Sequence, residues 1–243
     1  MRLPFSCMEC TFGEDKLPVP PYPTYVELKD DGRYEFTCPQ GHKTVTILQQ
    51  QKFELLFEIG AYALIDGYYR ESVASFTASL ERFYEFFVRV VFLRERLQNG
   101  DFEEAWKMMS SQSERQLGAY IASYLIVFKS PPTPLSNSNV KFRNSVIHKG
   151  VIPSKKEAIQ FGQAIMNIIN PVLSRLIDKY PEEIHQAIFS HLVNSRKRDE
   201  QQPTTTMSVP TIISLARGKE EKLKPLEDYL ESLQWWRDRW HYN

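Results

Sequence analysis

Cysteine is scarce in this 243-residue chain, and its few copies are unevenly placed. All three cysteines lie within the first 40 residues. An odd number in one short segment does not suit a framework of paired disulfides. The clustering instead directs attention to a metal site near the start of the chain.

The chain also lacks long apolar runs and any excess of one charge. No stretch reaches the roughly 18 apolar residues that a membrane span needs. The opening segment, MRLPFSCMEC, does not have the charged and apolar parts of a secretory signal. We therefore expect a soluble, cytoplasmic protein without a membrane partner. Because the formal net charge is zero, a site for a polyanion has to be a local patch.

Apolar residues are nonetheless plentiful, and their spacing divides the chain into three regions. Residues 1–46 are rich in proline, glycine and short polar segments. Residues 47–199 have helical periodicity almost throughout. Residues 200–243 form a C-terminal extension, with a strand expected at Thr211–Leu215 and a final helix beginning at Pro225. The sequence predicts a mostly α fold, a helical bundle preceded by a small β-hairpin module.

The β-hairpin is predicted within residues 24–38. Polar and apolar residues alternate over Thr24–Leu28 and Arg33–Cys38, as in strands with one buried face. Asp31-Gly32 lies between them and suits a tight turn that needs positive φ. We therefore expect these two strands to pair with each other.

Two pairs of potential metal ligands lie on either side of this hairpin. Cys7 and Cys10 form a C-x2-C pair, and Cys38 and His42 form a C-x3-H pair. Three thiolates and an imidazole are a ligand set for tetrahedral zinc, and four protein ligands leave no position for water. The prediction is a structural zinc site in a zinc-ribbon-like module. The alternative is that the two pairs have unrelated roles.

The helix expected at Ser138–Lys149 places a charge within an apolar stripe. It follows a proline-rich break, and at 100° per residue Arg143 falls between Val146 and Ile147 around the helix axis. A buried charge is costly unless it is paired. Arg143 therefore either meets a carboxylate in the core or faces a cleft in which an anionic ligand supplies the negative charge.

The residues around this helix favour the cleft. Between Lys129 and Lys156 there are six Lys or Arg residues and no Asp or Glu, which gives a local positive field. A guanidinium also suits phosphate, because it donates two parallel hydrogen bonds. Glu81 and Glu85, on the helix expected over residues 71–97, could meet Arg143, but a solvated or structural role is the favoured interpretation of these two acids.

The segment Arg143-Asn144-Ser145-Val146-Ile147-His148 resembles the Arg-polar-x3-His form of the motif found in HEPN domains. The order of helices over residues 47–180 is also similar to that family. The resemblance implies an all-helical domain, a homodimer in which two motifs face one cleft, and cleavage of RNA without a catalytic metal.

The resemblance also assigns roles to individual residues. His148 would be the general acid or base toward the ribose 2′-hydroxyl or the leaving oxygen. Arg143 would hold the scissile phosphate, and Asn144 would orient the imidazole or the phosphate. Lys141 and Lys149 are candidate substrate-binding residues on the same helix. Attack by the 2′-hydroxyl implies a 2′,3′-cyclic phosphate product and no cleavage of DNA.

Other interpretations stay open at this stage. The family implies a toxin or phage-defence effector held in check by a protein regulator or antitoxin. The main alternative is a non-catalytic HEPN-like module that binds RNA, a nucleotide or a partner protein, and a third is a scaffold for protein contacts. His148 taken alone could be a surface histidine that favours a helix C-terminus. Trp235, Trp236 and Trp240 could stack on bases, but packing is the commoner role.

Overall fold

The computed structural model describes residues 1–13, 23–97, 99–197, 204–217 and 222–240, and it divides the chain into two compact units. The first unit comprises residues 1–51 and 188–210, and the second comprises residues 52–187 and 211–243. The sequence boundary expected after residue 46 lies close to the first of these divisions. Residues 188–197 and 204–210 fold with the N-terminal segment, which the sequence pattern alone did not indicate.

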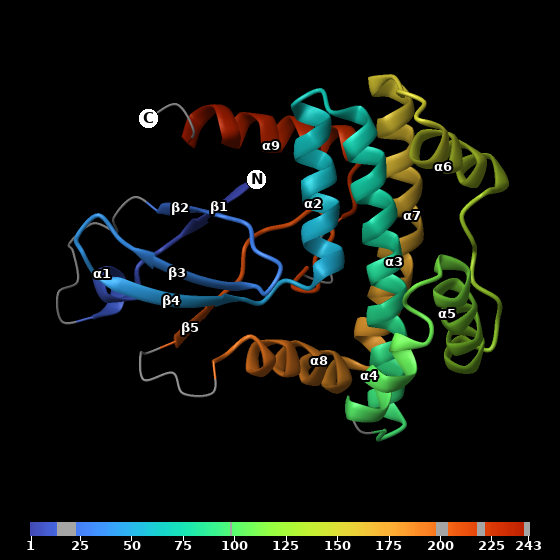
Figure 1. Cartoon of the computed structure of the whole chain (residues 1–243), viewed down its shortest axis with the longest axis horizontal. Helices are drawn as coiled ribbons and strands as arrows, with labels where there is room; N and C mark the ends of the chain where they lie inside the picture. Colours follow the sequence, from blue (N-terminus) through green and yellow to red (C-terminus); the bar gives the residue numbers. More distant parts are fainter. Residues whose placement is uncertain (14–22, 98, 198–203, 218–221, 241–243) are drawn as a thin grey trace. The chain divides into compact units, whose positions relative to one another are not determined.

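The first unit contains two small sheets (Figure 1). In one sheet, β1 (Arg2–Phe5) pairs antiparallel with β2 (Thr24–Glu27). In the other, β3 (Arg33–Thr37) pairs antiparallel with β4 (Lys43–Leu48), and β5 (Thr204–Met207) pairs parallel with β4. The five-residue helix α1 (Met8–Phe12) follows β1 directly.

The predicted strands exist, but the predicted pairing between them is wrong. β2 is bonded to β1 and β3 to β4, so the hairpin of this unit is β3–β4. Gly32 does adopt the expected positive φ, at 66°, but its turn links two different sheets. The partners of β2 and β3 come from sequence on their outer sides, which a pattern limited to residues 24–38 does not reveal.

The strand expected at Thr211–Leu215 is also wrong. The strand lies at Thr204–Met207, and residues 211–217 form turns that bond to the helix α2 (Lys52–Ile65). Buried Glu54 and Glu58 of α2 accept the backbone N–H groups of Leu215 and Ile212, at 2.8 and 3.0 Å. These carboxylates satisfy N–H groups that a β ladder would otherwise have paired.

The second unit is helical, as predicted. It contains α3 (Tyr69–Arg94), α4 (Asn99–Lys107), α5 (Ser113–Phe128), α6 (Asn137–Lys149), α7 (Lys155–Lys179) and α9 (Leu226–Trp240), and α8 (Pro181–Asn194) begins in it. The long helix α3 packs against α2, α5, α6 and α7 (Figure 1). Its buried face is aromatic, and Phe76, Phe83 and Phe87 are fully enclosed.

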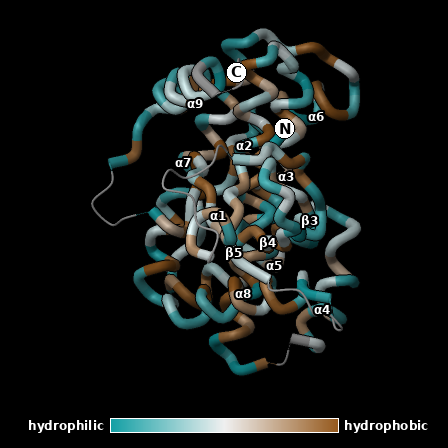
Figure 2. The backbone as a smooth tube through the Cα atoms, turned by 90° about the vertical axis from the view of Figure 1, so that its left-hand side faces the viewer, coloured by the Kyte–Doolittle hydropathy of each residue, from teal (hydrophilic) through white to brown (hydrophobic). Residues whose placement is uncertain are grey.

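Apolar residues are distributed along the helices and do not form a long continuous apolar segment. Figure 2 shows hydrophobic and hydrophilic residues interspersed along the backbone. Among the helices in the part of the chain that the structure describes, none combines the length and apolar character needed to cross a membrane.

Close packing at Gly162 of α7 gives a test of this core. A Cβ built there would lie 2.5 Å from the ring of Phe76 and 2.7 Å from the side chain of Leu226, both of which are fully buried. We expect Gly162→Ala to lower the free energy of unfolding by about 1–3 kcal/mol through overpacking. Gly118→Ala on α5, where no atom lies within 4 Å, should be neutral or stabilise by up to about 1 kcal/mol. Equal denaturation midpoints for the two variants would contradict this packing.

Burial of Glu58 predicts a pH dependence of stability. Burial raises the pKa of its carboxyl from 4.5 to about 7, although the N–H of Ile212 acts in the opposite direction. The folded protein therefore holds this proton more tightly than the unfolded chain does. The resulting stability is fully present below pH 4.5 and is lost as the pH rises through 7.

Glu58→Gln keeps an acceptor for the N–H of Ile212 but removes the charge. We expect the variant to gain stability relative to the wild type between pH 5 and pH 8, by up to about 3 kcal/mol, since one pKa unit corresponds to about 1.4 kcal/mol. Chemical denaturation of both proteins at the two pH values measures this difference. A difference that does not change with pH would contradict the assignment.

Candidate functional site

The four predicted metal ligands come together in the first unit. Cys7 lies between β1 and α1, and Cys10 lies within α1. Cys38 and His42 bracket the turn between β3 and β4, where Gly41 has a φ of 87° that favours glycine. The ligand atoms of the four residues all lie within 4.8 Å of one another. The predicted grouping is therefore confirmed, and the site can bind a metal ion.

Most of the distances between ligand atoms in this cluster are close to those around a tetrahedral zinc ion. Zinc bonds of about 2.3 Å to sulfur and 2.0–2.1 Å to nitrogen require about 3.8 Å between two sulfurs and about 3.6 Å between a sulfur and a nitrogen. The sulfurs of Cys10 and Cys38 are 3.8 Å apart. The His42 Nδ1 lies 3.8, 3.2 and 3.7 Å from the sulfurs of Cys7, Cys10 and Cys38.

The electrostatics of the cluster also favour a bound cation. Burial and the sulfurs of Cys7 and Cys38 raise the pKa of the Cys10 thiol to about 12. Burial opposes ionisation of Cys7 as well, but hydrogen bonds from Thr44 and from the Cys10 backbone outweigh it and lower the pKa of Cys7 to about 6. Three thiolates cannot share this space without a positive charge, and a divalent metal would supply it.

The cluster is largely buried. The three cysteines are buried and His42 is half-buried. The hydroxyl of Thr44 donates to the Cys7 sulfur at 3.5 Å, an outer contact of the kind that orients a metal ligand. Four protein ligands without an open position are typical of a structural site rather than a catalytic one.

The motif helix α6 belongs to the second unit and has well-defined ends. The Ser136 side chain accepts from the backbone N–H of Asn139, and Gly150 ends the helix with a φ of 70°. Both ends agree with the predicted helix to within a residue. The caps fix where the helix begins and ends.

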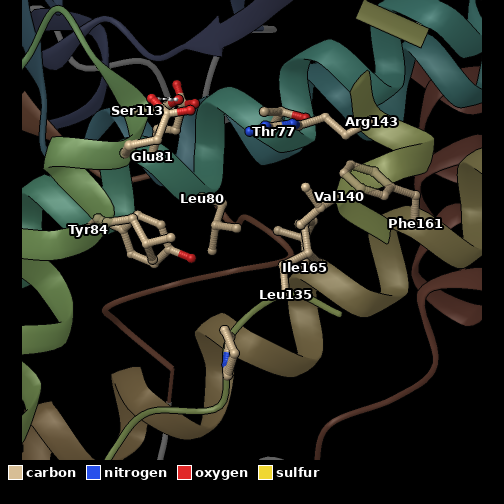
Figure 3. A pocket seen from close by; sticks show the side chains of 13 residues that line it. Thr77, Leu80, Glu81, Tyr84, Ser113, Leu135, Val140, Arg143, Phe161 and Ile165 are labelled. Carbon is tan, nitrogen blue, oxygen red and sulfur yellow. Dashed lines mark hydrogen bonds between the residues drawn. The ribbon is translucent and has the colours of Figure 1, made fainter. Parts of the chain in front are cut away.

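Arg143 lies in the wall of a cavity of about 180 Å³ formed by α3, α5, α6 and α7 (Figure 3). Its Nε and Nη2 donate to the Asn144 side-chain oxygen at 3.0 and 2.8 Å. Among the described residues, no carboxylate lies within ion-pair distance of this half-buried guanidinium. Asn144 thus orients Arg143, and the charge of the guanidinium is not neutralised by a direct ion pair.

Two acids face the same cavity. Glu81 of α3 and Glu114 of α5 line it, together with the ring of Tyr84. Burial raises the pKa of Glu81, and Glu114 adds to the rise. Arg143 acts in the opposite direction, so it lies near enough for electrostatic interaction with Glu81.

Of the solvated and structural roles considered from the sequence, a solvated stripe does not apply to Glu81, which is half-buried and lines the cavity. Its neighbour Glu85 instead pairs with Arg82 at 2.6 Å and with Arg89 at 3.7 Å. Thr77 and Tyr84 also line the cavity, and sequence reasoning did not single them out. Their spacing with Glu81, at i, i+4 and i+7, places all three on one helix face and is the signal that could have found them.

The other predicted site residues lie outside this cavity. His148, Lys141 and Lys149 are exposed on α6 and are not among the residues that line it. His148 and Arg143 are five residues apart, which separates them by about 140° around the helix axis. A single chain therefore brings Arg143 and Asn144 together but directs His148 elsewhere.

The tryptophan cluster is partly accessible. Trp235 and Trp236 of α9 are about half exposed, at 53% and 52%, and their rings meet edge to face at 4.9 Å. Arg237, next to them, pairs with Asp66. The side chain of Trp240 lies outside the described residues.

Comparison of the chain with protein-family models, with curated proteins and with solved structures gives no match in any of the three.

Proposed function

We propose that this chain is an endoribonuclease of the HEPN type, which cuts RNA by attack of the ribose 2′-hydroxyl without a catalytic metal. The main support is Arg143, a half-buried guanidinium that lines a cavity and whose direct partner is a neutral amide. A cation held in this way is ready to receive an anion, because it has not been neutralised by an internal carboxylate. The motif resemblance suggests a phosphodiester as this anion.

In the proposed reaction, the 2′-hydroxyl oxygen attacks phosphorus and loses its proton to a general base. The bond from phosphorus to the 5′-oxygen breaks, and that oxygen takes a proton from a general acid. The products are a 2′,3′-cyclic phosphate and a 5′-hydroxyl. Arg143 stabilises the charge on the phosphate oxygens, and His148 transfers a proton. Lys141 and Lys149 contact neighbouring phosphates.

The proposal requires two copies of the chain. Arg143 and His148 point in directions about 140° apart on one helix. The HEPN resemblance supplies the arrangement, a homodimer in which two copies of α6 face a shared cleft. His148 is exposed and therefore accessible to such a cleft.

We further propose that the metal of the first unit is zinc and that it serves the fold. Cys7, Cys10, Cys38 and His42 provide soft and borderline ligands, which favour zinc over calcium or magnesium. The ion would hold the β3–β4 turn against α1, in a unit with little core of its own.

The resemblance also suggests a toxin or phage-defence effector, with a protein regulator or antitoxin as partner. This part of the proposal rests on the family alone and guides the choice of in vivo assay. Growth arrest on expression, relieved by a His148 substitution, is the expected result.

The experiment that tests the reaction compares RNA with DNA. Purified protein is incubated with an oligoribonucleotide and with a deoxyribonucleotide of the same sequence, without added magnesium. We expect cleavage of the RNA only, with 2′,3′-cyclic phosphate ends identified by mass spectrometry. Cleavage of the DNA strand, or ends bearing a 5′-phosphate, would contradict the proposed mechanism.

The second candidate is a non-catalytic module that binds RNA, a nucleotide or a protein. One observation favours it, namely that His148 is not among the residues that line the cavity with Arg143. Such a module would bind RNA with equal affinity with or without His148 and would never cut it. Gel-shift and cleavage assays on the same preparation separate the two candidates.

A further inference from the structure

The cavity beside Arg143 contains a carboxylate that the fold does not use. Glu81 is half-buried, and among the described residues no hydrogen bond or ion pair is made by its carboxylate. Burial makes ionisation of this group costly, as the raised pKa of its carboxyl reflects. A ligand that donates hydrogen bonds to this carboxylate would offset the cost of burying it.

We propose that this cavity is a binding pocket for a guanine base of the RNA substrate. The inference rests on the proposed function, because it takes the phosphate attached to the same nucleotide to lie at Arg143. The base enters the cavity, and its N1–H and N2–H groups donate to the two oxygens of Glu81.

The charges around the cavity orient such a nucleotide. Figure 3 shows Glu81 and Ser113 on one side of the cavity and Arg143 on the other, close to Thr77. Glu114 adjoins Ser113 and adds a second carboxylate to the cavity wall. A phosphate is repelled by the two acids and attracted by the guanidinium. The base, which is neutral and has donors, is therefore the part that reaches Glu81.

The remaining wall suits a flat ring. Leu80, Val140, Phe161 and Ile165 provide apolar surface, and Tyr84 adds an aromatic ring. The volume of about 180 Å³ exceeds the roughly 150 Å³ of an apolar cavity that admits benzene. The space therefore admits a planar ring of the base and excludes a larger folded ligand.

Hydrogen-bond chemistry selects guanine among the four RNA bases. Guanine presents two adjacent donors on its Watson–Crick edge, which match the two oxygens of a carboxylate. Adenine and cytosine each present one donor group beside an acceptor nitrogen that would face the negative charge. Uracil presents one N–H between two carbonyl oxygens. Each of these three bases would place an acceptor atom next to the negatively charged carboxylate of Glu81.

Calorimetric titration with nucleoside 3′-monophosphates tests the pocket without any cleavage. The probes are the guanosine, adenosine, cytidine and uridine compounds, titrated separately into the wild-type protein. We expect guanosine 3′-monophosphate to bind at least about tenfold more tightly than the other three, which corresponds to one bidentate pair. Equal affinity for the four compounds, or no binding, would overturn the inference.

Matched variants on α3 assign the preference to Glu81. Glu81→Gln replaces one acceptor by an NH₂ donor and should abolish the preference for guanosine. Glu85→Gln, one turn further along the same helix and outside the cavity, should retain it. Equal preference in both variants would overturn the inference.

Val140→Phe fills the cavity from α6, leaves both charged groups in place, and should also abolish guanosine binding. This second variant keeps the test decisive if Glu81→Gln does not fold, which thermal melts would reveal. Guanosine binding retained in Val140→Phe would overturn the inference.

The outcomes for the pocket and for the proposed function are distinguishable. RNA cleavage without preference for guanine would refute the pocket and leave the ribonuclease intact. Selective binding of guanosine 3′-monophosphate without any RNA cleavage would support the pocket and refute the ribonuclease.

Discussion

Replacing Cys38 by serine is expected to abolish metal binding and to unfold the first unit. The wild-type protein should contain about one zinc per chain by elemental analysis, and the variant should contain none. Binding of structural zinc by small domains is worth about 10–16 kcal/mol near neutral pH, more than a unit of this size gains from its core. We therefore expect the first unit of the variant to lose its folded structure completely rather than partly.

Hydrogen exchange measures the structural effect of this substitution. Amides of β3 and β4 should lose protection in Cys38→Ser, because the metal fixes the turn between these strands. Gln40→Ala is the matched control, since Gln40 is exposed in the same turn and supplies no ligand. Metal-free wild-type protein with full protection of these strands would contradict the account.

If the proposed mechanism holds, removing the imidazole of His148 should slow RNA cleavage strongly. A positioned general acid or base contributes about 10²–10⁴-fold to a rate, so we expect His148→Ala to reduce RNA cleavage by that factor. The side chain is exposed, and its loss should leave the fold and the proposed dimer unchanged. Single-turnover cleavage rates and size-exclusion chromatography measure the two expectations.

The control for this variant is another exposed histidine. His185 lies on α8, outside the motif, and His185→Ala should cut RNA at the wild-type rate. Wild-type rates for both histidine variants would remove His148 from the mechanism and favour the binding-module alternative. Loss of the dimer in His148→Ala would mean that the residue acts through assembly instead.

The helical part of the fold was predictable because its signals are local. Repeating apolar residues lie within the helices that they define, and the cap at Ser154 and the stop at Gly150 lie directly next to them. The strand pairing was not predictable in this way. β5 joins β4 through Val45 and Thr204, which lie far apart in the sequence, and no local pattern specifies that partnership.

The two candidate sites also differ in how far local sequence patterns predict them. The metal cluster was predictable because C-x2-C and C-x3-H are short patterns whose chemistry requires them to meet. The surroundings of Arg143 were not, because Glu81 and Glu114 reach the cavity from other helices. The sequence left open whether the guanidinium of Arg143 pairs with a carboxylate or faces a cleft. The packing of α3 against α6 decides between the two.

The most direct test of the central claim is the cleavage rate of one RNA oligonucleotide by wild-type protein, Arg143→Lys and Arg143→Ala. If Arg143 receives the scissile phosphate, the alanine variant should be slower by at least about 100-fold. The lysine variant should be intermediate, because it keeps the charge but loses the two parallel hydrogen bonds. Cleavage by all three proteins at one rate would contradict the account.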